Sequence, residues 1–325
     1  MPSTLPFTDS EPPPAKRQRT DDIQTIRRSD IWNSDGSVVL QAETIQFRVH
    51  WSILARNSSF FRDMQSLPQP PNQPCVEGCP VVEVCDKPSD VENLLKALYD
   101  PTFLCQKVIT VSAVGALLRL GRKYDFKDLY QLAVSRLTSE YPANLDEFDA
   151  LPEEYIAIEG YNGATFDLVN IASDNSIMSI LPGAYFFIIN KFTTEEIFQG
   201  VDNEDGTRSC LAPIHIQRCV SALQTLIIKQ AQPNYTFGWA LTKSDSECTG
   251  AARCNAARID AVHKFVFNPT ATFYGLVQPD MVRFNLCARC TSQAKQSINT
   301  GRSKIWDELP EAFGLAPWDE LKNEY

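Results

Sequence analysis

The sequence predicts an α+β protein. A small sheet with helices forms an N-terminal domain, a mainly α-helical region follows, and a loop-rich segment containing cysteines comes last. Three short runs with strand character precede residue 85, and apolar residues recur at helical spacing from Val91 onward. The chain has 325 residues, 43% hydrophobic and 22% charged, which suffices for a buried core and two domains of ordinary size. We divide it into a tail at 1–29, an N-terminal domain at 30–140, an extension at 141–232 and a cysteine segment at 233–325.

Residues 1–29 are expected to form a disordered tail, because prolines interrupt its first half and no apolar periodicity follows. Within it, Lys16-Arg17-Gln18-Arg19 has the form of a simple nuclear-import signal, with the charge on Lys16, Arg17 and Arg19. The alternative is a solvated run of charge, since basic clusters of this length also arise by chance. We expect the protein in the nucleus, the cytoplasm or both.

The N-terminal domain begins with a predicted strand pair. Val38–Leu40 is a short apolar run, Thr44–Val49 alternates between apolar and polar residues, and a turn falls near Ala42-Glu43. Short helical turns follow at 51–61. A loop comes next at 67–79, where prolines exclude a helix or a central strand. Val81–Val84 is the third predicted strand.

The remaining predicted elements are helices. Ser89 and Glu92 have the spacing of a capping box, and Asp100-Pro101 ends the helix that they open. Two more helices of the domain are expected at 112–120, ending at Gly121, and at 126–138. The patterns of the extension predict helices at 147–158, 164–173, 185–192 and 213–229. Apolar residues between 305 and 321 are expected to pack the end of the sequence onto the extension.

This order of elements, and the residues within it, resemble a BTB/POZ domain over about 30–140. The residues that carry the resemblance are Asp30-Ile31-Trp32, Val38-Val39-Leu40, Phe47-Arg48-Val49-His50, Ser58-Ser59-Phe60-Phe61, Leu94–Tyr99, Ala116-Leu117-Leu118 and Lys123-Tyr124. The layout of the whole chain is similar to the expanded BTB families of mushroom-forming fungi. The resemblance implies a protein-interaction domain and puts His50 at its centre, beside Asp30. His50 then either fixes the turn from strand to helix or forms a polar pair near an assembly groove.

The resemblance also bears on partners. BTB domains that recruit cullin-type ubiquitin ligases carry a hydrophobic-x-Glu motif in the region of the 67–79 loop. The nearest approximation here is Cys75-Val76-Glu77, with cysteine in the hydrophobic position. The tail offers no amphipathic helix to exchange between subunits. We therefore expect other proteins as partners, leave a homodimer through another face open, and find no sequence support for ligase recruitment.

Composition and motifs argue against several functions. Forty acidic and 30 basic residues give a net charge of −10 and a pI near 4.9, which disfavours nucleic acid and anionic lipid as partners. No apolar run reaches membrane-spanning length, and the first residues lack an apolar signal region. Glycine-rich phosphate loops and the hydrolase nucleophile motif are absent from the sequence. We predict a non-enzymatic adaptor. The alternative is a nuclear regulator whose zinc-stabilised C-terminal segment contacts nucleic acid.

Cysteines give the strongest indication of a cofactor. Cys248-x5-Cys254 and Cys287-x2-Cys290 are two close pairs, and four thiolates in two pairs are typical ligands of one structural zinc ion. His263 is a substitute ligand, and the alternative is four unligated thiols with Cys287 and Cys290 at the start of a helix. In a chain without secretory features the other cysteines are expected to be ordinary thiols. These are Cys75, Cys79, Cys85, Cys105, Cys210 and Cys219.

Overall fold

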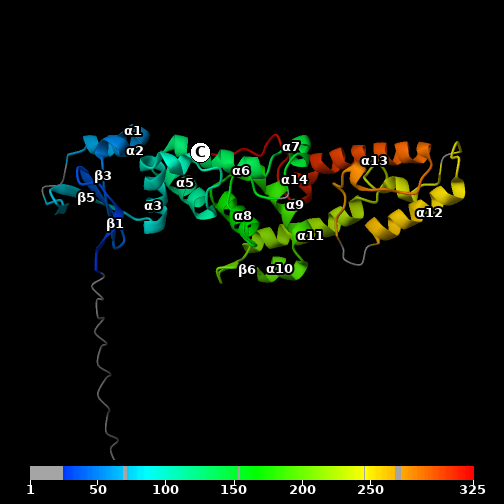
Figure 1. The fold of residues 1–325 in the computed structure, drawn as a ribbon, viewed down its shortest axis with the longest axis horizontal. Coiled ribbons are helices and arrows are strands. Elements are labelled where there is room, and N and C mark those ends of the chain that lie inside the picture. The colour runs from blue at the N-terminus through cyan, green and yellow to red at the C-terminus, as the bar shows by residue number, and fades with distance from the viewer. Residues whose placement is uncertain (1–24, 69–71, 153, 245, 268–271) are drawn as a thin grey trace, which may run out of the picture.

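The structure is a computed structural model that describes residues 25–68, 72–152, 154–244, 246–267 and 272–325. The basic cluster of Lys16, Arg17 and Arg19, and the predicted tail up to residue 24, lie outside the described residues. The described chain is elongated, with the N-terminal domain at one end, the extension in the middle and the cysteine segment at the other end (Figure 1).

A five-stranded sheet in the order β1-β3-β2-β5-β4 forms the N-terminal end of the molecule. Its strands are β1 (Arg27–Trp32), β2 (Val38–Ala42), β3 (Ile45–Val49), β4 (Cys75–Val76) and β5 (Cys79–Val84). The three predicted strands are confirmed, and β2 and β3 pair antiparallel around Glu43, whose φ is +48°. β1 was not predicted. It pairs parallel with β3, and because it begins at Arg27 the folded domain starts within the predicted tail.

Helices α1 to α6 complete this domain. They are α1 (Trp51–Asn57), α2 (Ser59–Ser66), α3 (Pro88–Tyr99), α4 (Pro101–Cys105), α5 (Val111–Lys123) and α6 (Lys127–Glu140). The predicted capping box at Ser89 is wrong, because the N-cap of α3 is Lys87. The helix begins at Pro88, a position where the missing N–H of proline leaves no hydrogen bond unmade. Gly121 does not end α5. It lies inside the helix, where a Cβ would come within 3.0 Å of the Tyr130 Cβ, so it allows close packing of α5 against α6.

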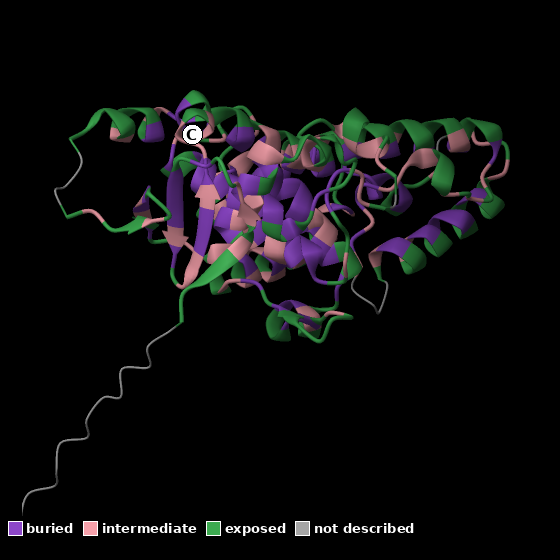
Figure 2. Ribbon diagram, turned by 60° about the vertical axis from the view of Figure 1, so that its left-hand side comes forward, coloured by how far each residue is buried: buried purple, intermediate pink, exposed green. Residues whose placement is uncertain are grey.

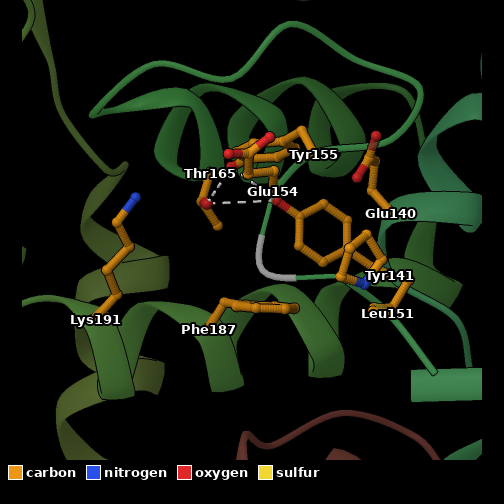
Figure 3. Close-up of a pocket in the computed structure, with 9 residues that line it drawn as sticks. Glu140, Tyr141, Leu151, Glu154, Tyr155, Thr165, Phe187 and Lys191 are labelled. Carbon is orange, nitrogen blue, oxygen red and sulfur yellow. Dashed lines mark hydrogen bonds between the residues drawn. The ribbon is translucent and has the colours of Figure 1, made fainter. Parts of the chain in front are cut away.

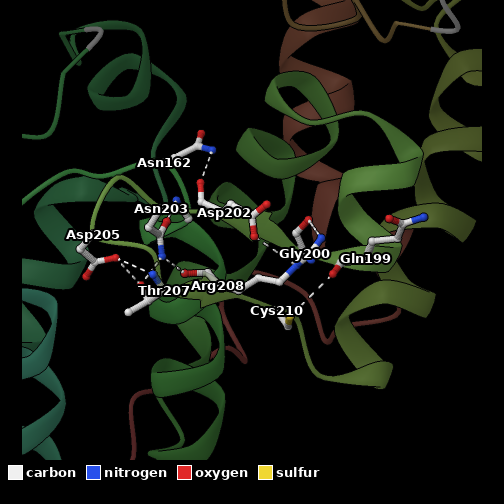
Figure 4. A network of polar contacts seen from close by, with 11 residues as sticks. Asn162, Gln199, Gly200, Asp202, Asn203, Asp205, Thr207, Arg208 and Cys210 are labelled. Atoms are coloured by element: carbon white, nitrogen blue, oxygen red, sulfur yellow. Dashed lines mark hydrogen bonds and ion pairs between the residues drawn. The ribbon is translucent and has the colours of Figure 1, made fainter.

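The extension contains α7 (Leu145–Asp149), α8 (Ala164–Asp174), α9 (Leu181–Lys191), α10 (Thr194–Gln199) and α11 (Pro213–Lys229). The predicted helices at 164–173, 185–192 and 213–229 are confirmed, but the one at 147–158 is wrong because α7 ends before Pro152. The extension also contains a hairpin of β6 (Val201–Asp202) and β7 (Arg208–Ser209), which was not predicted from the sequence. Side chains help to hold its turn, with the Thr207 hydroxyl donating to the Asp205 carboxylate at 2.6 Å (Figure 4).

The cysteine segment is more helical than the sequence suggested. It contains α12 (Ala251–Ala261), which continues as a π-helical turn (Val262–Val266), α13 (Ala288–Asp307) and α14 (Leu309–Ala312). The expected packing of the end of the sequence is confirmed, since Trp318 stacks on Trp306 with ring centroids 5.3 Å apart and Phe313 packs beside Tyr185. Among the described residues, no helix combines the length and apolar character that crossing a membrane requires.

One hydrophobic core runs from β2 and β3 through the extension to α14. Figure 2 shows buried residues concentrated in the middle of the molecule, where these parts meet. A smaller apolar cluster around Phe237, Phe265 and Ile298 lies in the cysteine segment. The cysteine segment therefore has a core of its own, and it is a small one.

Candidate functional site

The structure brings Cys248, Cys254, Cys287 and Cys290 together into one cluster. All four Sγ atoms lie within 4.8 Å of one another, and Cys248 Sγ is 3.8 Å from Cys287 Sγ and 3.6 Å from Cys290 Sγ. A tetrahedral site with zinc–sulfur bonds of about 2.3 Å separates its sulfurs by about 3.8 Å. The four-cysteine cluster is therefore already near the geometry that a tetrahedral ion requires.

Two helices hold these cysteines in place. Cys248 lies in the turn before α12, Cys254 on α12, and Cys287 and Cys290 at the N-cap and in the first turn of α13. Cys254 and Cys290 are fully buried and Cys248 is partly exposed. The cluster thus joins the starts of two helices that lie 33 residues apart along the chain at Cys254 and Cys287.

The local electrostatics favour a thiolate at Cys287 and a protonated thiol at Cys290. The amide of Cys287 donates to Cys254 Sγ at 3.2 Å, and the positive end of the α13 dipole faces Cys287 and Cys290. Backbone hydrogen bonds, first from Cys290 and then from Thr249, lower the pKa of Cys287. Burial, and next the neighbouring thiol of Cys287, raises the pKa of Cys290. Metal binding requires deprotonated sulfur, so an ion would replace the proton that Cys290 otherwise retains.

His263 and the six other cysteines lie outside this cluster. The cluster that could hold a metal is made of four cysteines and does not include His263, which lies in the π-helical turn. The other cysteines are free thiols: Cys79 and Cys219 are buried, and Cys75, Cys85, Cys105 and Cys210 are exposed. Burial raises the pKa of Cys219 to about 12, which keeps it an inert thiol.

His50 lies at the start of α1, as the sequence indicated, but its partners differ from those expected. Its amide donates to the Tyr99 hydroxyl at 2.7 Å, and its ring contacts Tyr99 and Asp35 instead of Asp30. These bonds tie the turn between β3 and α1 to the end of α3. His50 is therefore a structural residue of the domain.

Cys75-Val76-Glu77, the approximation to a ligase-recruiting motif, forms β4 and the start of the tight turn into β5. Glu77 has a φ of +51°, and Gly78 follows with +77°. The Glu77 carboxylate is bound by Arg28 at 2.6 Å and by Arg48 at 2.8 Å. These pairs join β1, β3 and the turn, so this carboxylate is used within the fold.

A pocket of about 160 Å³, which the sequence did not reveal, lies where α6 meets the extension (Figure 3). Tyr141, Tyr155 and Thr165 meet there, and the Tyr155 and Thr165 hydroxyls are 2.6 Å apart. Burial, and next the neighbouring Tyr155, raises the pKa of Tyr141 well above its ordinary value. These hydroxyls therefore form a neutral network that holds the junction together.

Glu140 lines the same pocket and links the N-terminal domain to the extension. Its carboxylate accepts hydrogen bonds from the backbone amides of Ile156, Ala157 and Ile158. The side chain is buried, with 6% exposed. A carboxylate at a helix C-terminus interacts unfavourably with the negative end of the helix dipole. The hydrogen bonds from the three amides offset this interaction.

Comparison with known families agrees with the fold of the first part of the chain. Residues 33–140 match the family model of the BTB/POZ domain. Comparison with curated proteins gave no match. The matched residues begin directly after β1 and end with α6, at the junction with the extension.

Proposed function

We propose that this protein, whose residues 33–140 are a BTB/POZ domain, is a non-enzymatic adaptor that binds other proteins through that domain. BTB/POZ domains mediate protein-protein interaction and dimerisation, and this match is the observation that carries the proposal. The titratable groups of the described site fit structural roles: Glu140 binds backbone amides, Glu77 binds arginines, and His50 fixes a turn. The extension then holds the BTB/POZ domain and the cysteine segment at a set distance from each other.

The partner class follows from the same contacts. Ligase recruitment through Glu77 is not part of the proposal, because Arg28 and Arg48 already bind its carboxylate. A homodimer is compatible with the domain. Affinity capture with the full chain tests the proposal: proteins bound independently of nuclease treatment and of salt above physiological strength are the expected result. Loss of all bound protein under those conditions would contradict it.

The cofactor of this adaptor is one structural zinc ion, bound by Cys248, Cys254, Cys287 and Cys290. Four thiolates fill a tetrahedral site and leave no position for water or substrate, which is typical of structural and not catalytic zinc. The ion closes a long loop and links α12 to α13. The apolar cluster beside it is too small to hold these two helices together without the ion. Its role is to hold the cysteine segment folded.

A second candidate function is a nuclear regulator whose zinc-held segment contacts nucleic acid. The observation in its favour is local charge. Residues 242–304 contain nine Lys and Arg and four Asp and Glu, whereas the whole chain has a net charge of −10. Retention of the full chain on DNA that falls steeply with salt would favour this candidate, because each phosphate contact adds about 0.9 to the slope of log K against log salt. A flat salt dependence favours the adaptor.

Entry into the nucleus is proposed to depend on the basic cluster of the tail. Replacing Lys16, Arg17 and Arg19 by alanine removes the charge that an import receptor would read. A fluorescent fusion of this variant should shift towards the cytoplasm relative to wild type. A matched variant with the exposed residues Arg56, Lys107 and Lys243 replaced by alanine controls for loss of charge alone. An unchanged distribution would reduce the cluster to solvated charge.

A further inference from the structure

The last residues of the sequence return to the BTB/POZ domain. After α14 the chain turns at Gly314, whose φ is +66°, and residues 317–325, here called the strap, run back beside the extension. Figure 1 shows this segment in red, extending from α14 towards α5 and α6. The strap thus connects the far end of the chain to the first domain.

Contacts along the strap are few and regularly spaced. The Trp318 indole donates to the Trp306 carbonyl at 2.8 Å, and Leu321 is the buried apolar anchor, with 8% exposed. Further on, the Asn323 side chain accepts from the Ser179 amide at 3.1 Å, and the Glu324 amide donates to the Ser176 carbonyl. Between these anchors the side chains face solvent.

The strap ends in a polar site made by the junction of α5 and α6. The Tyr325 hydroxyl donates to the Asp125 carboxylate at 2.6 Å, and its ring meets Tyr130 edge-on, with centroids 4.8 Å apart. The Tyr130 hydroxyl donates to the Glu324 carbonyl, and the Lys127 ammonium lies 5.8 Å from the centroid of the Tyr325 ring. Both the side chain and the backbone of the strap are therefore recognised.

This site is held by the domain independently of the strap. Asp125 has a φ of +55° and accepts a hydrogen bond from the Ser59 hydroxyl of α2. The hydrogen bonds from Ser59, and then from Tyr325, hold the pKa of Asp125 below its ordinary value. Tyr130 is anchored in the hydrophobic core. An acceptor prepared in this way loses little conformational freedom when it binds.

The strap carries Asp319, Glu320 and Glu324 against a single lysine, and Arg122 and Lys127 lie close in sequence to the acceptor carboxylate of Asp125. The strap has fewer buried apolar side chains than a core helix, because only Leu321 is buried, Trp318 is half-buried on Trp306, and Tyr325 is 42% exposed. Such a segment opens far more often than the core does.

We propose that Asp125, Lys127 and Tyr130 form a peptide-binding site on the BTB/POZ domain, which the chain's own strap occupies and which a partner segment takes when the strap is released. The partner segment has the chemistry of the strap: a tyrosine whose hydroxyl donates to Asp125, preceded by a backbone carbonyl that accepts from the Tyr130 hydroxyl. The strap is then a built-in competitor that limits access to this surface.

The test measures binding of a fluorescent peptide with the sequence of residues 316–325 to the full chain. The receptor is a Leu321→Asp Tyr325→Ala variant, in which only strap residues change and the acceptor is intact. We expect this variant to bind the peptide about tenfold more tightly than wild type, in which the strap competes. A peptide carrying Tyr325→Phe should bind about tenfold more weakly, since it lacks a charge-assisted hydrogen bond.

Hydrogen exchange on the same variant supplies the second readout. The strap should lose protection while α5, α6 and the sheet keep theirs. Equal binding of the peptide to wild type and variant would overturn the proposal, as would no binding to a variant with an intact domain. Retained protection of 317–325 in the variant, or equal affinity of the Tyr and Phe peptides, would also overturn it.

Discussion

Replacing Cys287 and Cys290 by serine should abolish zinc binding and unfold the part of the cysteine segment from α12 to the start of α13, while the BTB/POZ domain stays folded. The two substitutions remove half of the ligands and leave Cys248 and Cys254 with no tetrahedral partner set. Structural zinc in small domains contributes an apparent binding free energy of about 10–16 kcal/mol, which appears as folding free energy. The small apolar cluster around Phe237 and Phe265 cannot replace that contribution. Metal analysis should give one zinc per wild-type chain and none in the variant.

Hydrogen exchange locates the damage. Protection should fall between α12 and the start of α13, and should remain in β2, β3 and α5, which belong to the main core. A chelator added to wild type should reproduce the pattern. Cys210→Ser, at an exposed thiol outside the cluster, is the matched control and should keep its zinc. A wild-type protein purified without chelators and free of metal would show that the four cysteines are packed thiols.

Glu140→Ala should be the most destabilising single substitution at the junction of the BTB/POZ domain and the extension. It leaves the amides of Ile156, Ala157 and Ile158 without their acceptor in a buried place. If each unpaired amide costs about 1 kcal/mol, the loss is about 3 kcal/mol. That corresponds to a fall in melting temperature of about 6–12 °C for a domain of 150–250 residues. Thermal unfolding measures the fall.

Glu140→Gln is the matched control for this effect. Its amide oxygen still accepts hydrogen bonds from the backbone, while its NH2 group replaces one acceptor, so the loss should be smaller, at about 1–2 kcal/mol. Protection of the 156–158 amides should follow the same order: wild type, Gln, Ala. An Ala variant as stable as wild type would show that water or another group satisfies these amides, and that the carboxylate does not hold the junction.

The sequence revealed those parts of the fold that local patterns encode. Alternation at Thr44–Val49 and the apolar stripe from Val91 to Leu98 gave a strand and a helix, because burial of one face selects residues at a fixed period. β1 has no such signal. Arg27, Arg28 and Asp30 are polar, and the strand exists because its backbone pairs with β3, which lies later in the chain.

Features of the site that depend on residues far apart in the sequence could not be predicted either. The spacing of the cysteines identified the four residues of the cluster and allowed a helix to start at Cys287 and Cys290, but it did not reveal that this helix is 20 residues long. Glu140 was not identified from the sequence, since its partners are backbone amides and leave no trace in side-chain patterns. Tyr325 and Asp125 are separated by 200 residues, and no periodicity connects them.

Proximity labelling in cells tests the central claim most directly, namely that the BTB/POZ domain makes this protein an adaptor. The full chain, its Cys287→Ser Cys290→Ser variant and the labelling enzyme alone are compared at equal abundance, with nuclease treatment before recovery. The account predicts one set of proteins labelled by wild type above the enzyme alone, retained by the cysteine variant because its BTB/POZ domain stays folded. A set that disappears with the cysteine variant or with nuclease, or no set above the enzyme alone, would contradict it.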